Sequence, residues 1–118
     1  MEIVKVSGTD IELTTTKTFV KKTTRSYRIW TESQDALKLA GFVPDAKYSI
    51  KYCEGPGGGI ALKLDPEGSR RVTKATRNGK ARAIIDLHSN KVAEIFEAGT
   101  EIEVVYQSNG IIVFKEAK

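Results

Sequence analysis

Four basic side chains lie within nine residues of the segment KATRNGKARAII, residues 74–85. They are Lys74, Arg77, Lys80 and Arg82, and no acidic residue lies among them. Clustered ammonium and guanidinium groups attract phosphates, and arginine can also pair with guanine edges. The segment continues into Ala83-Ile84-Ile85, an apolar run typical of a buried strand. We therefore expect a polyanion-binding arm that is joined directly to the protein core.

Basic residues are concentrated in two windows of the chain. The 118 residues carry a net charge of +4, with 19 Lys and Arg against 15 Asp and Glu. Residues 14–31 and 68–85 contain no acidic residue and together hold 11 of the 19 cations. The alternative to polyanion binding is that these side chains serve solubility and protect strand edges from aggregation. The candidate nucleic-acid-binding residues are Arg25, Arg28, Arg70, Arg71, Lys74, Arg77, Lys80 and Arg82.

Few residues offer catalytic or metal-binding chemistry. Cys53 is the single cysteine and His88 the single histidine, so no Cys/His cluster has zinc spacing. Asp86 and His88 would share one face of a strand. The chain has no second histidine, however, and no nearby pair of carboxylates with a clear role. The glycine-rich segment 55–59 is not followed by the Lys-Ser or Lys-Thr of a phosphate-binding loop. We expect a non-enzymatic protein with no catalytic residues, no metal and no cofactor.

The composition is that of a soluble globular protein, with 40% hydrophobic and 29% charged residues. No apolar run approaches the roughly 18 residues of a membrane span. The N-terminus lacks a charged segment followed by an apolar one, so we expect no signal peptide. The expected location is the cytoplasm, in association with the nucleoid, with no membrane partner.

The second half of the chain repeats the pattern of the first half at a spacing of 54 residues. The two copies correspond over residues 28–52 and 82–106. Identity is low, but arginine, phenylalanine and tyrosine recur in the pairs Arg28 and Arg82, Phe42 and Phe96, and Tyr52 and Tyr106. We predict an internal duplication with an N-terminal extension over 1–16, a first repeat over 17–66 and a second repeat over 67–118.

Each copy is expected to form a basic strand, a second strand, a short helix and a hairpin. KYSIKY and EIEVVY alternate polar and apolar residues, as half-buried strands do. Glycine opens the last strand of each copy, at Gly59 and Gly110, after a loop that is three residues longer in the first copy. Ser89 or Asn90 is the expected cap of the second helix. Arg77-Asn78-Gly79 predicts a tight turn.

The order of these motifs resembles the AbrB/SpoVT swapped-hairpin DNA-binding family. The resemblance rests on Gly79-Lys80, Ala83-Ile84-Ile85, the helix, and GTEIEVVYQSNGIIV. The first copy also resembles the SymE-type branch, in LAGF and the glycine-led last strand, but it has Arg25-Ser26-Tyr27-Arg28 in place of the Gly-Lys turn. The resemblance covers about residues 17–116.

This resemblance implies an α+β, mostly β fold. Two tandem β-α-β-β swapped-hairpin units would form an intramolecular pseudo-dimeric barrel, with both basic hairpins projecting on one side. Arg77, Lys80 and Arg82 would lie nearest the DNA groove. Tyr27 is the aromatic residue that we expect to stack on bases. The expected core residues are Trp30, Ile50, Ile84, Ile85, Val104 and Ile112.

The implied function is that of a DNA-binding transcriptional regulator that lays basic β-hairpin arms on the duplex. One alternative is a SymE-like RNA-binding or RNA-cleaving toxin-type protein. Another is a small accessory or viral protein that binds and modulates a host nucleic-acid enzyme. Double-stranded DNA is thus the expected partner, with RNA as the alternative. Whether the chain forms a homodimer or binds a protein partner stays open.

Overall fold

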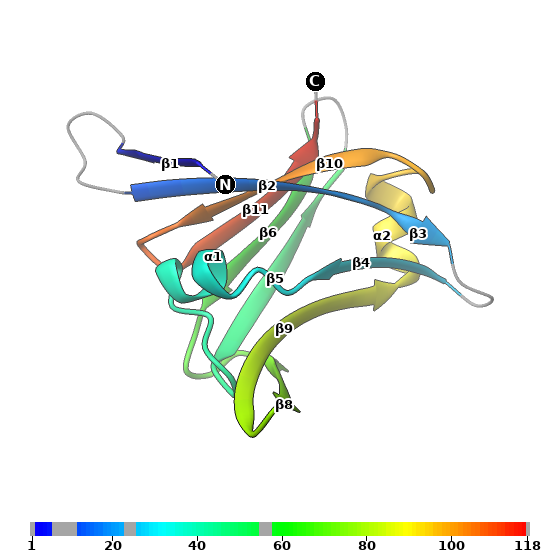
Figure 1. Ribbon diagram of the computed structural model, residues 1–118. Coiled ribbons are helices and arrows are strands. Elements are labelled where there is room, and N and C mark those ends of the chain that lie inside the picture. Colours follow the sequence, from blue (N-terminus) through cyan, green and yellow to red (C-terminus); the bar gives the residue numbers. More distant parts are fainter. Residues whose placement is uncertain (1, 6–11, 23–25, 55–57, 118) are drawn as a thin grey trace.

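A computed structural model describes residues 2–5, 12–22, 26–54 and 58–117 of the chain (Figure 1). Within these residues the chain forms a mostly β, α+β fold of two antiparallel sheets and two short helices. The spatial order of the seven-stranded sheet is β1 (Glu2–Lys5), β2 (Glu12–Phe19), β10 (Glu101–Gln107), β11 (Ile111–Glu116), β6 (Gly59–Leu64), β5 (Lys47–Cys53) and β7 (Arg70–Arg71). The order of the four-stranded sheet is β3 (Lys21–Lys22), β4 (Tyr27–Thr31), β9 (Lys80–Ser89) and β8 (Thr73–Arg77). The described strands leave both sheets open, so the expected closed barrel is not seen in them.

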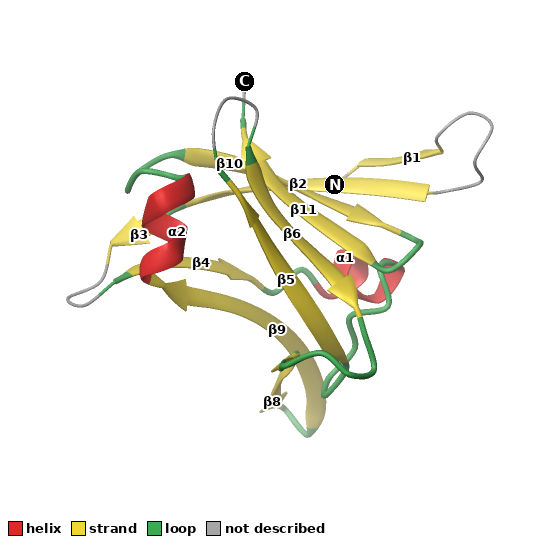
Figure 2. Cartoon of the chain, turned by 180° about the vertical axis from the view of Figure 1, so that it is seen from behind, coloured by secondary structure: helices red, strands yellow, loops and turns green. Residues whose placement is uncertain are grey.

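The two helices lie between the sheets and contact both of them. Helix α1 (Gln34–Leu39) contacts β2 and β10 of the larger sheet and β9 of the smaller one. Helix α2 (Asn90–Ile95) contacts β5 of the larger sheet and β4 and β9 of the smaller one. Figure 1 shows them on opposite sides of the molecule, and Figure 2 shows β5, β6 and β11 side by side from behind. No described helix is long and apolar enough to cross a membrane.

Apolar residues at helical spacing explain why these short helices form. Ala36 and Leu37 of α1 and Val92 of α2 are fully buried against the sheets. The Ser89 hydroxyl accepts a hydrogen bond of 3.1 Å from the backbone N–H of Lys91, so Ser89 is the cap of α2. Isolated helices of this length are unstable in water, so tertiary packing is what holds them.

The core lies between the two sheets. Ile85, Val104 and Ile112 are fully buried there, as expected, and Ile50 packs half-buried against them. Of the other two expected core residues, Ile84 is buried, whereas Trp30 is only partly buried and lies outside this cluster. In β4 and β9, Ile29, Ile85 and Leu87 face the core, and alternation turns Trp30 and Ile84 to the opposite face.

The element order of the first half recurs in the second half. β4-α1-β5-β6 is followed by β9-α2-β10-β11. The hairpins β3–β4 and β8–β9 pair in the same register. Lys21 pairs with Arg28 in the first, and the residues 54 positions further along, Ala75 and Arg82, pair in the second. The first strand of each half pairs with the hairpin of the other half, β2 with β10 and β7 with β5.

The halves also meet each other at corresponding residues. Thr31 pairs with Ile85 between β4 and β9, and Ala61 pairs with Val113 between β6 and β11. An antiparallel pairing of corresponding residues is what a twofold relation between the halves produces.

In each half, one buried valine forms backbone hydrogen bonds with the other half, and the two valines occupy corresponding places. Val20 exchanges backbone hydrogen bonds of 2.8 and 3.0 Å with Gly99 and Thr100. Val72 exchanges bonds of 2.8 and 3.1 Å with Ala46 and Asp45. These valines are 52 residues apart, two fewer than the spacing of 54 between the halves. The difference arises because β8 (Thr73–Arg77) of the second half is longer than β3 (Lys21–Lys22) of the first half.

The register corrects one detail of the sequence alignment. Cys53 pairs with Gly59, which leaves five loop residues, and Gln107 pairs with Ile111, which leaves three. The loop of the first half is therefore two residues longer, not three. Gly59 corresponds in register to Ile111, and Gly110 lies in the turn.

Tyr106 links the two sheets through its hydroxyl group. It hydrogen-bonds to Thr31 of β4 and, at 3.1 Å, to Thr16 of β2. Burial raises the pKa of Tyr106, and the bonds to the two threonines act in the opposite direction. The raised folded-state pKa means that the stabilisation is complete below the unfolded pKa of about 10 and is lost as pH rises further.

We therefore expect the free energy of unfolding to fall above about pH 10, and to fall less in Tyr106→Phe. Urea unfolding of both proteins between pH 8 and pH 11 measures this. Burial also raises the pKa of Tyr48, so part of the decline persists in the variant. The same pH slope in the variant and the wild-type chain would show that Tyr106 does not contribute.

Candidate nucleic-acid interface

The outer face of the four-stranded sheet gathers side chains from both basic windows. Directly paired residues of an antiparallel sheet share a face. Lys21 pairs with Arg28, and Arg28 pairs with His88, on the face opposite to the core residues. Alternation along β9 adds Arg82 and Lys80. We call this surface the basic face, and it consists of Lys21, Arg28, Trp30, Lys80, Arg82, Asp86 and His88.

Charge is distributed unequally between the two sheets. The four-stranded sheet carries seven basic residues, two each in β3, β8 and β9 and one in β4, against one acidic residue, Asp86. The described strands of the larger sheet carry eight basic and five acidic residues. The positive potential is therefore concentrated on the smaller sheet, where it would attract a polyanion.

Arg28 is held in place at the centre of the basic face. Its Nε and Nη2 atoms each donate a hydrogen bond of 2.8 Å to the Asp86 carboxylate. This bidentate pairing raises the pKa of Arg28. The guanidinium group also lies 4.5 Å from the centroid of the Trp30 ring. Asp86 therefore offsets the charge of Arg28, and Lys21, Lys80 and Arg82 carry the uncompensated charge of the face.

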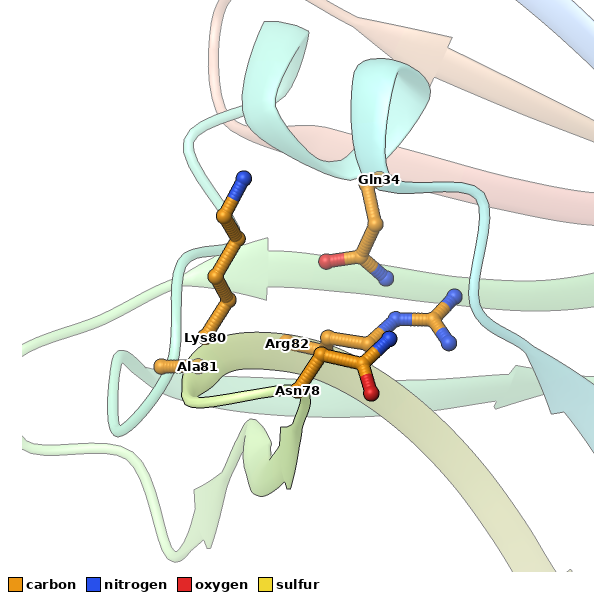
Figure 3. Close-up of a pocket in the computed structure, with 5 residues that line it drawn as sticks. All are labelled: Gln34, Asn78, Lys80, Ala81 and Arg82. Atoms are coloured by element: carbon orange, nitrogen blue, oxygen red, sulfur yellow. The ribbon is translucent and has the colours of Figure 1, made fainter.

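Two hollows are lined by side chains of the basic face. One, of about 270 Å³, is lined by Lys21, Arg28 and Trp30. The other, of about 590 Å³, lies between the start of α1 and the β8–β9 hairpin (Figure 3). Figure 3 shows Lys80 and Arg82 on opposite sides of this hollow. Its lining residues are Gln34, Asn78, Lys80, Ala81 and Arg82.

Gln34 closes one wall of the larger hollow by acting as a strand partner of β9. Its amide nitrogen donates to the Ala83 carbonyl at 2.8 Å, and its amide oxygen accepts from the Ala83 N–H at 2.9 Å. The nitrogen also donates to the Glu32 carbonyl at 2.6 Å. β4 ends at Thr31, so the Gln34 side chain continues the pairing of β9 by one step.

Replacing Gln34 by alanine should lower the free energy of unfolding by about 2 kcal/mol, because both backbone groups of buried Ala83 lose their partners. Chemical denaturation measures this difference. The neighbouring exposed Asp35→Ala variant is the control, with an expected change of about 0.5 kcal/mol or less. Equal stability of the two variants would show that the Gln34–Ala83 bonds do not hold this edge.

The tight turn of the β8–β9 hairpin is confirmed. Asn78 and Gly79 connect Arg77 and Lys80 with φ values of +53° and +75°. Two successive residues with positive φ are typical of the type I′ turn of a two-residue hairpin. The turn places Lys80 beside the larger hollow.

The fold divides the predicted binding residues among several places. Lys74 pairs with Ala83, so it faces away from Lys80 and Arg82. Arg70 and Arg71 lie in β7 at the edge of the other sheet, where Arg70 pairs with Tyr48 and Arg71 with Lys47. Arg77 lies in β8, but its side chain is outside the described part of the chain. Arg25 also lies outside the described residues.

The two basic hairpins were expected to project together on one side, and this expectation is wrong. Their central strands β4 and β9 are antiparallel, so the β3–β4 and β8–β9 connections lie at opposite ends of one sheet. β9 has ten residues, which corresponds to about 30 Å in an extended strand. The basic surface is therefore a sheet face with an arm at each end.

Sequence reasoning missed two kinds of residue. Gln34 and Asn78 line the larger hollow but carry no charge that would single them out. Lys21 lies in a basic window, but only strand register shows that it belongs with Arg28. Tyr27, the residue expected to stack on bases, packs against the core instead.

Within residues 2–5, 12–22, 26–54 and 58–117, no group of three or more His, Cys, Asp or Glu residues could hold a metal ion. Comparison of the chain with models of protein families, curated proteins and solved structures gave no match.

Proposed function

We propose that this protein is a non-enzymatic, DNA-binding transcriptional regulator whose basic face contacts the phosphate backbone. The observation that carries the proposal is the charge of the basic face, where Lys21, Arg28, Lys80 and Arg82 lie with one acidic residue, Asp86. That single carboxylate is already paired with Arg28. Lys21, Lys80 and Arg82, which form no ion pair with a described residue, would neutralise phosphates and release the counterions of the duplex.

The dimensions of the basic face favour duplex DNA. A two-stranded β-ribbon fits the major groove, and arginine side chains from it can reach base edges. The β8–β9 hairpin is such a ribbon. The length of β9, about 30 Å, is close to the roughly 34 Å of one helical turn. Arms at both ends of the sheet would therefore meet the duplex about one turn apart.

Stacking of unpaired bases is less well supported. Arg28 covers one face of the Trp30 ring at 4.5 Å, and its bidentate pairing with Asp86 holds it there. A base could stack on that ring face only after Arg28 is displaced. This geometry favours binding to the backbone of a duplex over a stacking platform for single-stranded RNA.

We further propose that the two halves are tandem swapped-hairpin units of the AbrB/SpoVT type, arranged as a pseudo-dimer within one chain. The exchange of first strands supports this, since β2 pairs with β10 and β7 with β5. The pairing of Thr31 with Ile85 and of Ala61 with Val113 also supports it. A regulator of this kind would work in the cytoplasm, on the nucleoid.

The test is fluorescence anisotropy of the purified chain with labelled duplex DNA and single-stranded RNA, each over a salt series. We expect duplex binding whose log K falls linearly with log salt, by about 0.9 per phosphate contact. A preference for RNA would favour the SymE-like alternative. Binding to neither nucleic acid would overturn the proposal and favour a protein partner.

A further inference from the structure

The contact between Gln34 and Ala83 shows what the exposed edge of β9 can bind. A planar amide lies on the backbone of one strand residue, donating to its carbonyl at 2.8 Å and accepting from its N–H at 2.9 Å. The groups that bind it are the ordinary N–H and C=O of a strand. Any planar ligand with an adjacent donor and acceptor can form the same pair of bonds.

Ala81 presents the same two groups to the same edge, two residues along. The N–H and C=O of alternate strand residues point to one edge, so those of Ala81 follow those of Ala83. β8 pairs with the other edge, and β4 ends at Thr31. Apart from the strand pairing with β8, no described residue forms a backbone hydrogen bond with Ala81. Ala81 is exposed and lines the larger hollow, so this edge is open to a ligand.

The groups around Ala81 select a ligand that carries negative charge. Lys80 and Arg82 flank it, and neither forms an ion pair with a described residue. The side-chain amide of Asn78 lies beside Arg82 (Figure 3). None of the described residues that line this hollow is acidic. Its volume of about 590 Å³ lies within the range of small-molecule sites, about 300–1,000 Å³.

We propose that this hollow binds a single unpaired nucleotide. The hydrogen-bonding edge of the base would lie on the N–H and C=O of Ala81, and the phosphate would be bound by Lys80 and Arg82. All common bases carry an adjacent donor and acceptor, so the site recognises an unpaired base without selecting its identity. This inference rests on the proposed function, because it adds an unpaired position to the duplex that the basic face contacts.

An extended acidic peptide is the competing ligand for the same edge. A peptide that adds to a sheet needs a run of free strand residues, because its affinity comes from repeated main-chain bonds. Here Gln34 occupies Ala83, so Ala81 alone is free before the turn. A nucleotide needs one such residue and a nearby cation, and this hollow supplies both.

The first test compares AMP, purine riboside 5′-monophosphate and inorganic phosphate as ligands of the wild-type chain, by NMR titration. Purine riboside 5′-monophosphate lacks the amino group that would donate to the Ala81 carbonyl. We expect it to bind about tenfold more weakly than AMP, because one hydrogen bond is lost. The Ala81 amide signal should shift with AMP and not with phosphate alone. Equal affinity for the three ligands would overturn the proposed base contact.

The second test uses proline to remove one N–H. Ala81→Pro removes the N–H that faces the hollow and keeps the pairing with β8, so AMP affinity should fall about tenfold. Thr76→Pro is the matched control, because Thr76 pairs with Ala81 and its N–H faces the opposite edge of the hairpin. Circular dichroism checks the fold of both variants. An equal loss of AMP affinity in both would contradict the assignment.

A nucleic-acid titration separates this inference from the proposed function. A duplex with one unpaired nucleotide should bind the wild-type chain more tightly than the fully paired duplex, and Ala81→Pro should abolish that difference. If paired and unpaired duplexes bind alike, the hollow is not a nucleotide site although the basic face still binds DNA. If neither binds, both proposals fail, and binding of an acidic peptide instead would identify the competing ligand.

Discussion

A variant in which Lys21, Lys80 and Arg82 are all replaced by alanine should bind duplex DNA about 100-fold more weakly than the wild-type chain, at roughly 1 kcal/mol per phosphate contact. These three cations lie on the basic face, and none forms an ion pair with a described residue. The salt dependence of log K should also become shallower, by about one unit for each phosphate that the variant no longer neutralises. Anisotropy titrations at several salt concentrations measure both effects.

The matched control removes the same charge from the other sheet. Lys17, Lys51 and Lys63 are exposed, and the strand register puts all three on the outer face of the seven-stranded sheet. Their triple alanine variant should keep duplex affinity within about threefold, because only the long-range field of the protein changes. A similar loss in both variants would mean that net charge, and not the basic face, determines binding.

Replacing Gly59 by alanine should lower the free energy of unfolding by about 3 kcal/mol, the upper end of the usual cost of overpacking. A Cβ atom at this position would lie 2.3 Å from the backbone carbonyl oxygen of Phe114. Gly59 sits between Lys115 of β11 and Cys53 of β5. The methyl group can fit only if β6 and β11 move apart. Chemical denaturation of the variant and the wild-type chain measures the loss.

Gly79→Ala is the control for this substitution. A Cβ atom on Gly79 would meet no atom within 4 Å, and the only cost is its φ of +75°. A non-glycine residue in this conformation loses about 1 kcal/mol. If Gly59→Ala costs no more than Gly79→Ala, then the close approach of β6 to β11 does not limit the stability of the sheet.

Local patterns predicted the elements of the fold well. The alternation in KYSIKY and EIEVVY, the cap at Ser89 and the turn at Asn78-Gly79 each depend on neighbouring residues, and the fold contains all of them. The number of sheets and the exchange of first strands depend on contacts between distant residues. The barrel expected from the sequence differs from the two open sheets for that reason.

Which face of a sheet an individual side chain lies on was harder to predict. Trp30 is apolar and was expected in the core, but in β4 the buried residues are its neighbours Ile29 and Thr31. Alternation then turns Trp30 to the outer face of the sheet, whereas Ile84 of β9, which was also expected in the core, is buried. The same rule separates Lys74 from Lys80 and Arg82, which sequence proximity had grouped together.

Composition predicted a concentration of basic residues, but not which of them share the basic face. Both windows contribute, yet Arg70 and Arg71 pair with the larger sheet, and Asp86 offsets the charge of Arg28. Gln34 gave no signal in sequence, because its role comes from the place where β4 ends beside β9. Such positions are set by tertiary register, which a single sequence does not reveal.

The most direct test of the basic face is the reactivity of its lysines toward an amine-labelling reagent, measured by mass spectrometry with and without duplex DNA. Lys21 and Lys80 should be protected by the duplex, because both would contact phosphates. Lys51 and Lys63, exposed on the other sheet, should react as they do in the free protein. Unchanged labelling of Lys21 and Lys80 in a DNA complex, or protection of Lys51 and Lys63 instead, would contradict the account.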